Sequence, residues 1–307
     1  MVAARALPDF GLDPAPLPLV ATSFNTLFRH GGSPGRRHDH VVRVGPELVV
    51  HPAGSGRVEA DWLDALRRDT DLAVPRIRRT AGGEPATAVT VAGVPGRRAA
   101  AVLSWVPGRA VGARRSAGLA RGAGRILAEL HDHAAATAPP APPAVPAADR
   151  ILYWEDPTLI HLLVPRYGTV FLEAVERSQR ALDRLWAAPP HPPHLLHGDL
   201  TPANLVDTGD GLVPIDFQDL VWGFEIHDVA IGLLPYQRHP AAAELTGAFR
   251  AGYGQVRPWP DADPALLDAL WAARRLAMLN LALNLGRPDL GDYVDRTAAG
   301  LAGWLRT

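Results

Sequence analysis

The hydrophobic pattern of the chain changes its period near Pro107-Gly108, and no other feature of the sequence constrains the fold as much. Before this point, short apolar runs are separated by Gly and Pro, which predicts β-strands. The expected strands cover 40–44, 86–91 and 98–106. One helix is expected between the first two of these strands, at 57–68, because apolar side chains recur there at helical spacing.

After Pro107-Gly108, longer segments with helical periodicity dominate. The expected helices cover 116–135, 170–187, 241–253, 264–285 and 292–305. The pattern therefore predicts an α+β protein. We expect a small antiparallel sheet with one helix over 1–106, a larger and mainly helical part over 107–307, and a hinge near 103–108. The proline-rich run 138–146 is expected to be a surface loop.

Composition excludes several classes of function. The 307 residues are 47% hydrophobic and 21% charged, which suits a folded globular protein. A formal net charge of -1 gives no basic field for nucleic acid or for an acidic membrane surface. The sequence has no apolar run long enough to cross a bilayer, so a cytoplasmic location is expected. With no cysteine, disulfides and thiolate chemistry are excluded.

All 31 cationic residues are Arg, and the chain contains no Lys. High-GC coding is the simplest explanation, because Ala, Gly and Pro are abundant as well. Any site that normally uses a lysine must therefore use an arginine here or do without a cation.

The stretch 194–219 carries the residues with the clearest chemistry. Asp199 and Asn204 follow an apolar segment, and Asp216 follows a second one, with a hairpin expected between 205 and 215 around the turn 207–211. Phosphoryl transfer requires a carboxylate to orient the attacking hydroxyl and oxygen ligands for Mg²⁺. Asp199, Asn204 and Asp216 are of these types, and the four residues between Asp199 and Asn204 equal the spacing in a kinase catalytic loop.

The alternative for this stretch is a hairpin with ordinary turn residues, since Asp, Asn and Gly favour turns anyway. A His-Gly-Asp alone would not separate the two interpretations. The combination with a correctly spaced Asn, an intervening Pro and the apolar-Asp-Phe sequence at 215–217 favours the catalytic one.

The same stretch resembles the signature of the aminoglycoside phosphotransferase family, which includes homoserine and choline kinases. The resemblance extends to 104–109, similar to a hinge between lobes, and to 251–253 and 272–276 in the helical part. It implies a bilobal protein-kinase-like fold that uses ATP and Mg²⁺ to phosphorylate a small hydroxylated molecule. The roles that it implies are catalytic base for Asp199, magnesium ligands for Asn204 and Asp216, loop bracing for His197 and a structural aspartate at Asp228.

The residues expected to bind the nucleotide match the kinase pattern less closely. Arg43 on the strand 40–44, with Glu59 on the following helix, is the best substitute for the kinase Lys-Glu pair, and His51 is a second candidate cation. The alternative is a surface arginine beside a solvated acid. The run 31–35 could cover the triphosphate but contains a proline, so a flexible turn is slightly favoured. At the hinge, the expected nucleotide contacts are Ser104, Trp105 and Val106.

The acceptor is expected between the catalytic loop and the C-terminal helices. The stretch 271–287 contains three arginines and no acid, which disfavours a polycation. The candidate acceptor contacts are Asp219, Arg275, Asn280 and Asn284. Asn280 and Asn284 share a helix face, although exposed helix polar residues would show the same spacing. Antibiotics, amino acids, sugars and amine alcohols all remain open as acceptors.

Two other functions remain as alternatives. A protein Ser/Thr kinase of the same superfamily is disfavoured because Gly198 replaces the arginine that precedes the catalytic aspartate in regulated protein kinases, and because only eleven residues separate Asp216 from Asp228. A kinase fold that binds nucleotide without turnover would explain the missing lysine, but not the intact Asp199, Asn204 and Asp216. His131 and His133 are expected to be a solvent-exposed pair at a helix end rather than a metal site.

Overall fold

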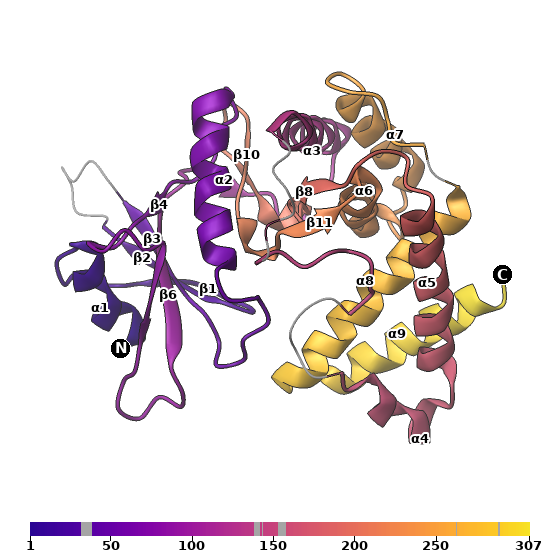
Figure 1. Cartoon of the computed structure of the whole chain (residues 1–307), viewed down its shortest axis with the longest axis horizontal. Helices are drawn as coiled ribbons and strands as arrows, with labels where there is room; N and C mark the ends of the chain where they lie inside the picture. Colours follow the sequence, from indigo (N-terminus) through magenta and orange to yellow (C-terminus); the bar gives the residue numbers. More distant parts are fainter. Residues whose placement is uncertain (32–38, 138–141, 143, 153–157, 262, 288) are drawn as a thin grey trace.

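The computed structural model describes the whole chain except residues 32–38, 138–141, 143, 153–157, 262 and 288. A sheet with few helices forms the N-terminal side of the molecule, and a mainly helical part carries the C-terminus on the other side (Figure 1). The predicted α+β class is therefore confirmed. The expected glycine turn beyond Gly31 and most of the proline-rich run lie outside the described residues.

The N-terminal sheet is antiparallel, with strands in the order β1-β2-β3-β6-β4 and β5 paired with β6. The strands are β1 (Leu19–Thr22), β2 (Thr26–His30), β3 (His40–Val44), β4 (Ile77–Arg78), β5 (Ala86–Val89) and β6 (Arg98–Ser104). The helical segments of this part are α1 (Val2–Ala6), the 3-10 turn η1 (Leu7–Phe10) and α2 (Ser55–Asp69).

Each face of this sheet is covered by a different helix. Val42 and Val102 pack against α1 and η1, whereas their neighbours Ala101 and Leu103 pack into the core that includes α2. Since side chains alternate between the two faces of a strand, Arg43 points to the α2 face of the sheet. The alternation thus directs the one cation of β3 toward the helix that carries Glu59.

The helical part follows the expected segments closely. Its helices are α3 (Ala117–Thr137), α4 (Val164–Tyr167), α5 (Val170–Ala187), α6 (Glu225–Leu233), α7 (Ala242–Tyr253), α8 (Pro264–Leu285) and α9 (Leu290–Leu305). Short 3-10 segments are η2 (Ile160–Leu163), η3 (Pro202–Asn204), η4 (Phe217–Asp219) and η5 (Leu234–Tyr236). The helix α6, which carries Asp228, was missed because it is buried along its whole length and so has no polar face to give a period.

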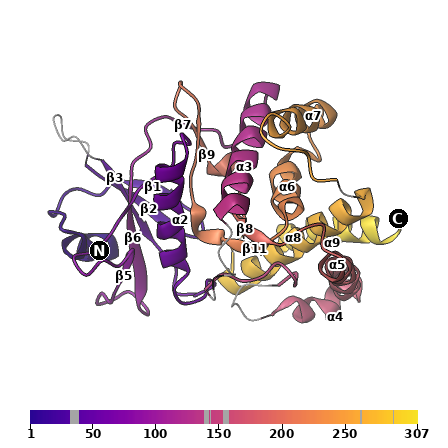
Figure 2. The same cartoon turned by 45° about the horizontal axis from the view of Figure 1, so that its top comes forward.

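Helices α3 and α7 lie unusually close together, as Figure 2 shows. A Cβ added to Gly124 would lie 2.0 Å from the carbonyl oxygen of Phe249, and one added to Gly252 would lie 1.9 Å from that of Arg121. Only glycine allows the two backbones to approach this closely. The contact fixes α3 against the core of the helical part.

Two small sheets lie between the two parts. The strands β9 (Leu205–Asp207) and β10 (Leu212–Pro214) form the expected hairpin, and β7 (Arg109–Ala110), just after the expected hinge, pairs with β9. The strand β8 (His194–Leu196) pairs with β11 (Val221–Gly223). These pairings bring the segments after β8 and after β10 to the same place, where the candidate catalytic residues lie.

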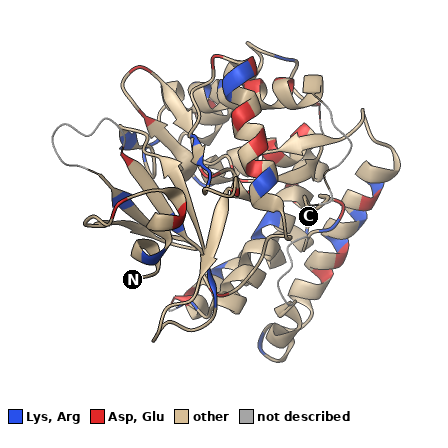
Figure 3. Cartoon of the chain, turned by 60° about the vertical axis from the view of Figure 1, so that its left-hand side comes forward, with Lys and Arg blue, Asp and Glu red and all other residues tan. Residues whose placement is uncertain are grey.

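Acidic and basic residues are interspersed on both parts of the ribbon, in keeping with the net charge of -1 (Figure 3). Over the described residues, none of the helices combines the length and the apolar character needed to cross a bilayer.

Candidate active site

The loop that follows β8 is held by Asp228 of α6. The backbone N–H groups of His197 and Gly198 donate to the two oxygens of the Asp228 carboxylate, at 2.9 and 2.8 Å. Gly198 has φ +77°, and a Cβ there would lie 1.8 Å from the carbonyl oxygen of Asp219. Glycine is therefore required before Asp199 by conformation and by space.

Asp228 is fully buried, and His131 of α3 is its third partner, at 3.3 Å. Burial alone would raise the pKa of Asp228, but the hydrogen bond and charge of His131 and the bond from Gly198 hold it below its usual range. An ionised carboxylate with these partners keeps the loop fixed.

The expectation for His131 and His133 is wrong, because neither histidine lies in solvent. The helix α3 continues to Thr137, and His131, His133 and Ala134 lie on its buried side. Nδ1 of His131 shares a hydrogen bond with the hydroxyl of Tyr253 at 2.9 Å. Nδ1 of His133 accepts a hydrogen bond from Nε1 of Trp62 at 3.2 Å. The two rings face different neighbours, as the helical spacing predicts.

His197 supports the loop from inside. Its ring is buried, packs against Phe217 with 4.5 Å between ring centroids, and its Nδ1 accepts the backbone N–H of Asp199 at 3.3 Å. Burial lowers the pKa of His197, which favours the neutral ring that this acceptor role needs.

Asp199 is held from two sides. Its Oδ2 accepts from Nδ2 of Asn204 at 2.7 Å, and its Oδ1 accepts from Nη2 of Arg274 on α8 at 2.6 Å. About 25% of the side-chain surface is open to solvent. Desolvation by the surrounding protein nevertheless raises the pKa of Asp199 to about 7; Arg274 opposes the rise, whereas Asp219 and Asp216 add to it. A carboxylate with such a pKa is suited to accepting a proton near neutral pH.

Asp216 is the only non-glycine residue with a positive φ in the described part of the chain, at +64°. Non-glycine residues in this region are strained, and such strain often accompanies function. The side chain is 37% exposed and lies 3.4 Å from Nη1 of Arg43. Burial of the group, with the charges of Asp219 and Glu59, raises the pKa of Asp216 to about 6, although Arg43 opposes the rise.

The residues present fit a divalent cation. Both N–H donors of the Asn204 amide are used by Asp199, through its backbone oxygen and its Oδ2. The amide oxygen is therefore the atom that Asn204 can offer to a metal. Asp216 offers a carboxylate that burial leaves under-solvated, so a nearby cation would stabilise its ionised form. Oxygen ligands of these two types are those that Mg²⁺ prefers.

The structure brings Arg43 and Glu59 together. Two charge-assisted hydrogen bonds join them, Nη1 to Oε1 at 2.9 Å and Nη2 to Oε2 at 2.6 Å, and Glu59 is buried. Trp62, one turn further along α2, packs edge-on against Phe217 beside Asp216. This contact positions α2 so that the guanidinium of Arg43 lies between Glu59 and Asp216.

A contact between His51 and Asp219 also borders the site. Nε2 of His51 lies 2.7 Å from Oδ1 of Asp219, and the ring of His51 contacts Phe24 edge-on. Phe24 and Asn25, in the turn between β1 and β2, line a cavity of about 400 Å³ together with Arg43 and Glu59. The turn between β1 and β2 is therefore a described turn that shares this cavity with Arg43.

At the expected hinge, Ser104 and Trp105 are joined to the N-terminal sheet. The N–H of Ser104 donates to the carbonyl of Arg76 at 2.8 Å, and that of Trp105 to the carbonyl of Asp39 at 2.9 Å. The guanidinium of Arg29 lies 4.6 Å from the centre of the Trp105 ring. Val106 follows, half-buried, between β6 and β7.

The three candidate acceptor residues on α8 also have partners within the protein. Arg275 donates to the side-chain oxygen of Gln237. Asn280 is buried, and its Oδ1 accepts from the backbone N–H of Leu159 at 2.7 Å. Nδ2 of Asn284 donates to the carbonyl of Asn280 at 2.9 Å. These contacts hold segments of the helical part, and Arg274, rather than Arg275, reaches Asp199.

Arg274 is the site residue that the sequence analysis missed. It was counted only among the arginines of the stretch 271–287. Its neighbour Arg275 has the same residue type, and the two differ in which side of α8 they face. The apolar pattern of α8 could have signalled that position 274 is buried, since it lies between buried alanine and leucine positions.

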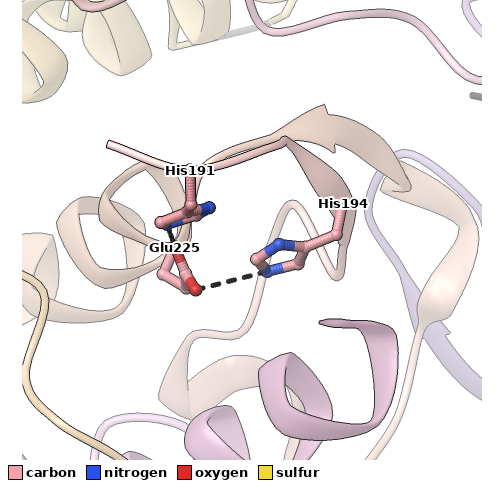
Figure 4. A group of neighbouring side chains, drawn as sticks. All are labelled: His191, His194 and Glu225. Carbon is pink, nitrogen blue, oxygen red and sulfur yellow. Dashed lines mark ion pairs between the residues drawn. The ribbon is translucent and has the colours of Figure 1, made fainter. Parts of the chain in front are cut away.

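A second charged cluster lies at the start of β8, away from Asp199. Figure 4 shows the carboxylate of Glu225 between the rings of His191 and His194, at 2.6 and 3.7 Å from their Nε2 atoms. One ligand atom of each residue lies within 4.8 Å of the others, a spacing that could hold a metal ion. Arg257 already donates to Glu225 at 2.7 Å, so the carboxylate is matched by a cation of the protein. We interpret the cluster as a structural polar network around the ion pair of Glu225 with Arg257.

The chain is similar to known proteins in sequence and in fold. A family model described as "Phosphotransferase enzyme family" matches residues 19–270. No protein with a curated description matches the chain.

Several solved structures share the fold. A microcompartment-associated aminopropanol kinase is 23% identical, with a TM-score of 0.71 over 98% of this chain and 94% of that one. The amicoumacin kinase hAmiN, solved with AMP-PNP, Ca²⁺ and Ami, is 18% identical, with a TM-score of 0.72 over 93% and 87%. A thermostable mutant of an aminoglycoside phosphotransferase, solved with ADP and hygromycin B, is 16% identical, with a TM-score of 0.62 over 98% and 96%.

Proposed function

The chain belongs to the phosphotransferase enzyme family, and on this premise we propose that it transfers the γ-phosphate of ATP, held with Mg²⁺, to a hydroxyl group of a small molecule. The fold is that of small-molecule kinases. Neither the family nor these structures support a protein kinase.

One observation carries the proposal. Asp199 and Asn204 form one group of contacts that reaches Arg274 on α8, and Asp216 and Arg43 form a second group that reaches Glu59 on α2. The backbone hydrogen bond from the N–H of Ile215 to the carbonyl of Asn204, at 3.0 Å, joins the two groups. Asp199, with its pKa raised to about 7, would accept the proton of the acceptor hydroxyl. Asn204 and Asp216 would hold Mg²⁺, which neutralises charge on the phosphates when bound.

Arg43 takes the place of the usual lysine in this proposal. The Glu59 carboxylate and Asp216 keep the pKa of Arg43 above its ordinary value, although burial alone would lower it. The guanidinium is therefore a fixed positive charge beside the proposed metal site. Since a guanidinium presents several N–H donors in one plane, it can keep Glu59 and bind a phosphate oxygen at once.

The remaining assignments follow from position. The turn at Phe24 and Asn25 would lie over the phosphates, and Ser104, Trp105 and Val106 would border the adenine. Asp219, paired with His51, would line the border between the nucleotide and the acceptor. His197 and Asp228 would act only by holding the loop that carries Asp199.

The test is ADP release from ATP and Mg²⁺ in the presence of a panel of hydroxyl compounds, with wild type and Asp199→Asn compared. We expect turnover with at least one small acceptor and a loss of about 10²- to 10⁴-fold in kcat for the variant, the usual contribution of a general base. ATP binding, measured by calorimetry, should survive in Asp199→Asn.

A matched control is Asp210→Asn, which makes the same change in the exposed turn between β9 and β10 and should keep full turnover. ATP binding without Asp199-dependent turnover on any acceptor would instead identify a non-catalytic nucleotide-binding protein. Radiolabel transfer to generic protein substrates, without transfer to any small molecule, would contradict the small-molecule proposal.

A further inference from the structure

One histidine of the helical part contacts α2 at two points. Nε1 of Trp62 donates to Nδ1 of His133 at 3.2 Å, and Nε2 of His133 lies 3.4 Å from Oδ2 of Asp69. An indole N–H only donates, so Nδ1 is the bare nitrogen of the ring and Nε2 carries the hydrogen that is shared with Asp69. The ring is buried, and both of its nitrogens are therefore used to hold α2 against α3.

The two contacts fall on the face of α2 that carries Glu59. Glu59, Trp62 and Asp69 follow one another at three and seven residues, which places them on one side of the helix. The contacts of His133 lie two turns apart, a separation of about 10 Å along the axis. A helix held at two such points cannot slide along its axis or turn about it without losing a hydrogen bond.

Trp62 extends this contact into the proposed active site. Its ring packs edge-on against Phe217, with 5.5 Å between ring centroids, and Phe217 follows Asp216 in the chain. At the start of α2, by contrast, the N-cap position is Gly54, which has no side chain to cap the helix. The position of Glu59 in the second turn therefore depends on contacts further along α2, among them those of Trp62.

Arg43, the partner of Glu59, lies between two carboxylates. It donates to Glu59 at 2.9 and 2.6 Å, and its Nη1 lies 3.4 Å from Oδ1 of Asp216. A hydrogen bond of this kind weakens once its atoms separate beyond about 3.2 Å. If α2 moved outward, the guanidinium would lose Glu59 and turn to Asp216. Asp216 would then be paired with Arg43 and would bind a metal cation less readily.

We propose that His133 is a positioning residue of the nucleotide site, which holds α2 where Glu59 binds Arg43. Arg43 is thereby kept off Asp216, and this carboxylate stays available to Mg²⁺. The inference rests on the proposed function. His133 acts through α2 and takes no part in the chemistry.

The first test measures initial rates of ADP release from ATP as the Mg²⁺ concentration is varied, for wild type, His133→Leu and His133→Gln. His133→Leu should raise the Mg²⁺ concentration for half-maximal rate and the KM for ATP by about three- to tenfold, the range expected for one lost hydrogen bond. The KM for the acceptor should stay unchanged. His133→Gln offers an oxygen to Trp62 and an N–H to Asp69, so it should restore most of the loss.

A matched pair of tryptophan variants tests the route through α2. Trp62→Phe keeps an aromatic ring against Phe217 but removes the N–H that His133 binds, so it should also raise the Mg²⁺ requirement. In the His133→Leu background this bond is already absent, and Trp62→Phe should add little. Trp186→Phe removes an indole hydrogen bond of the same kind, to the carbonyl of Ala148 at 3.0 Å, on α5 in the helical part. It should keep the wild-type requirement.

Hydrogen–deuterium exchange of the protein without nucleotide makes the outcome independent of turnover. The amides of α2 should exchange about threefold faster or more in His133→Leu than in wild type, because α2 opens more readily when it is released from α3. The amides of α5 should keep their rate. Calorimetry with a non-hydrolysable ATP analogue and Mg²⁺ should show a matching loss of affinity in the variant.

Two results would overturn the inference. One is a His133→Leu variant that unfolds at lower urea concentration but keeps the Mg²⁺ requirement, the KM for ATP and the exchange of α2, since His133 would then only stabilise the fold. The other is additive losses from Trp62→Phe and His133→Leu, which would show that the two residues act separately. If His133→Leu fails to fold, the comparison of Trp62→Phe with Trp186→Phe decides the question. Absence of Asp199-dependent turnover with every acceptor would instead overturn the proposed function, and exchange and calorimetry would still decide the role of His133.

Discussion

Asp228 accepts the backbone N–H of Gly198 at 2.8 Å, across thirty residues of chain, and thereby fixes the loop that carries Asp199. Its second oxygen accepts the N–H of His197. All three residues lie in the buried interior or at its border. The position of the proposed base therefore depends on a carboxylate that is itself fully buried.

Replacing Asp228 by Ala should destabilise the protein as a whole. The change leaves two buried N–H groups and His131 without their acceptor, and breaking a buried charged network in this way costs about 3 to 5 kcal/mol. Urea unfolding followed by circular dichroism measures the difference. Asp228→Asn keeps an acceptor oxygen and the volume, so it should cost clearly less than Asp228→Ala. Equal stability of Asp228→Ala and wild type would contradict the bracing role.

Gly198→Ala and Gly209→Ala separate backbone strain from steric overlap. Both glycines have a positive φ, +77° and +90°, so each substitution should cost about 1 to 3 kcal/mol through the backbone alone. An added Cβ has free space at Gly209 but meets the Asp219 carbonyl at Gly198. We expect Gly209→Ala to keep turnover and Gly198→Ala to lose most of it. If the two variants behave alike in thermal unfolding and in ADP release, the close approach is unimportant.

The pH dependence of kcat/KM should show the titration of Asp199. Since the carboxylate is the competent form and its pKa is raised to about 7, activity should rise with pH through this region and fall below it. Arg274 opposes the rise in the pKa of Asp199, so Arg274→Gln should move this limb to higher pH. Initial rates in overlapping buffers measure the profile. A limb that moves to lower pH in the variant would be incompatible with Asp199 as the base.

Protein stability should depend on His194 in a lower pH range. Burial lowers the pKa of His194 to about 4, below its usual value near 6.5. Between these two pH values, the side chain is therefore protonated in the unfolded chain and neutral in the folded protein. The free energy of unfolding should therefore decrease as the pH falls from about 6.5 to 4, and it is unaffected by this group at higher pH. His194→Asn should flatten the decrease, as urea titrations at several pH values would reveal. His161→Asn, at a position outside the core, is the control and should keep the wild-type slope.

Much of the architecture could be predicted from the sequence, because the hydrophobic periodicity indicates which faces of helices and strands are buried. The helices α5 and α8 were predicted at their observed bounds, and β3 and the hairpin of β9 and β10 were also found. The candidate catalytic residues Asp199, Asn204 and Asp216 could be chosen because residue type and short spacing together restrict the chemistry. Those spacings join residues that are close together in the chain, so a single sequence is enough to show them.

The tertiary structure decided which distant residues meet, because local sequence patterns do not indicate such contacts. The sequence contains many arginines, but only the packing of α8 against the catalytic loop selects Arg274, rather than Arg275, as the neighbour of Asp199. Packing also buried His131 and His133, which look like a helix-end pair in the sequence. Sequence alone determined which groups could do chemistry, because that depends on residue type and near neighbours. The fold determined which charges meet and with what pKa, because burial and contact across 75 residues of chain have no local signature.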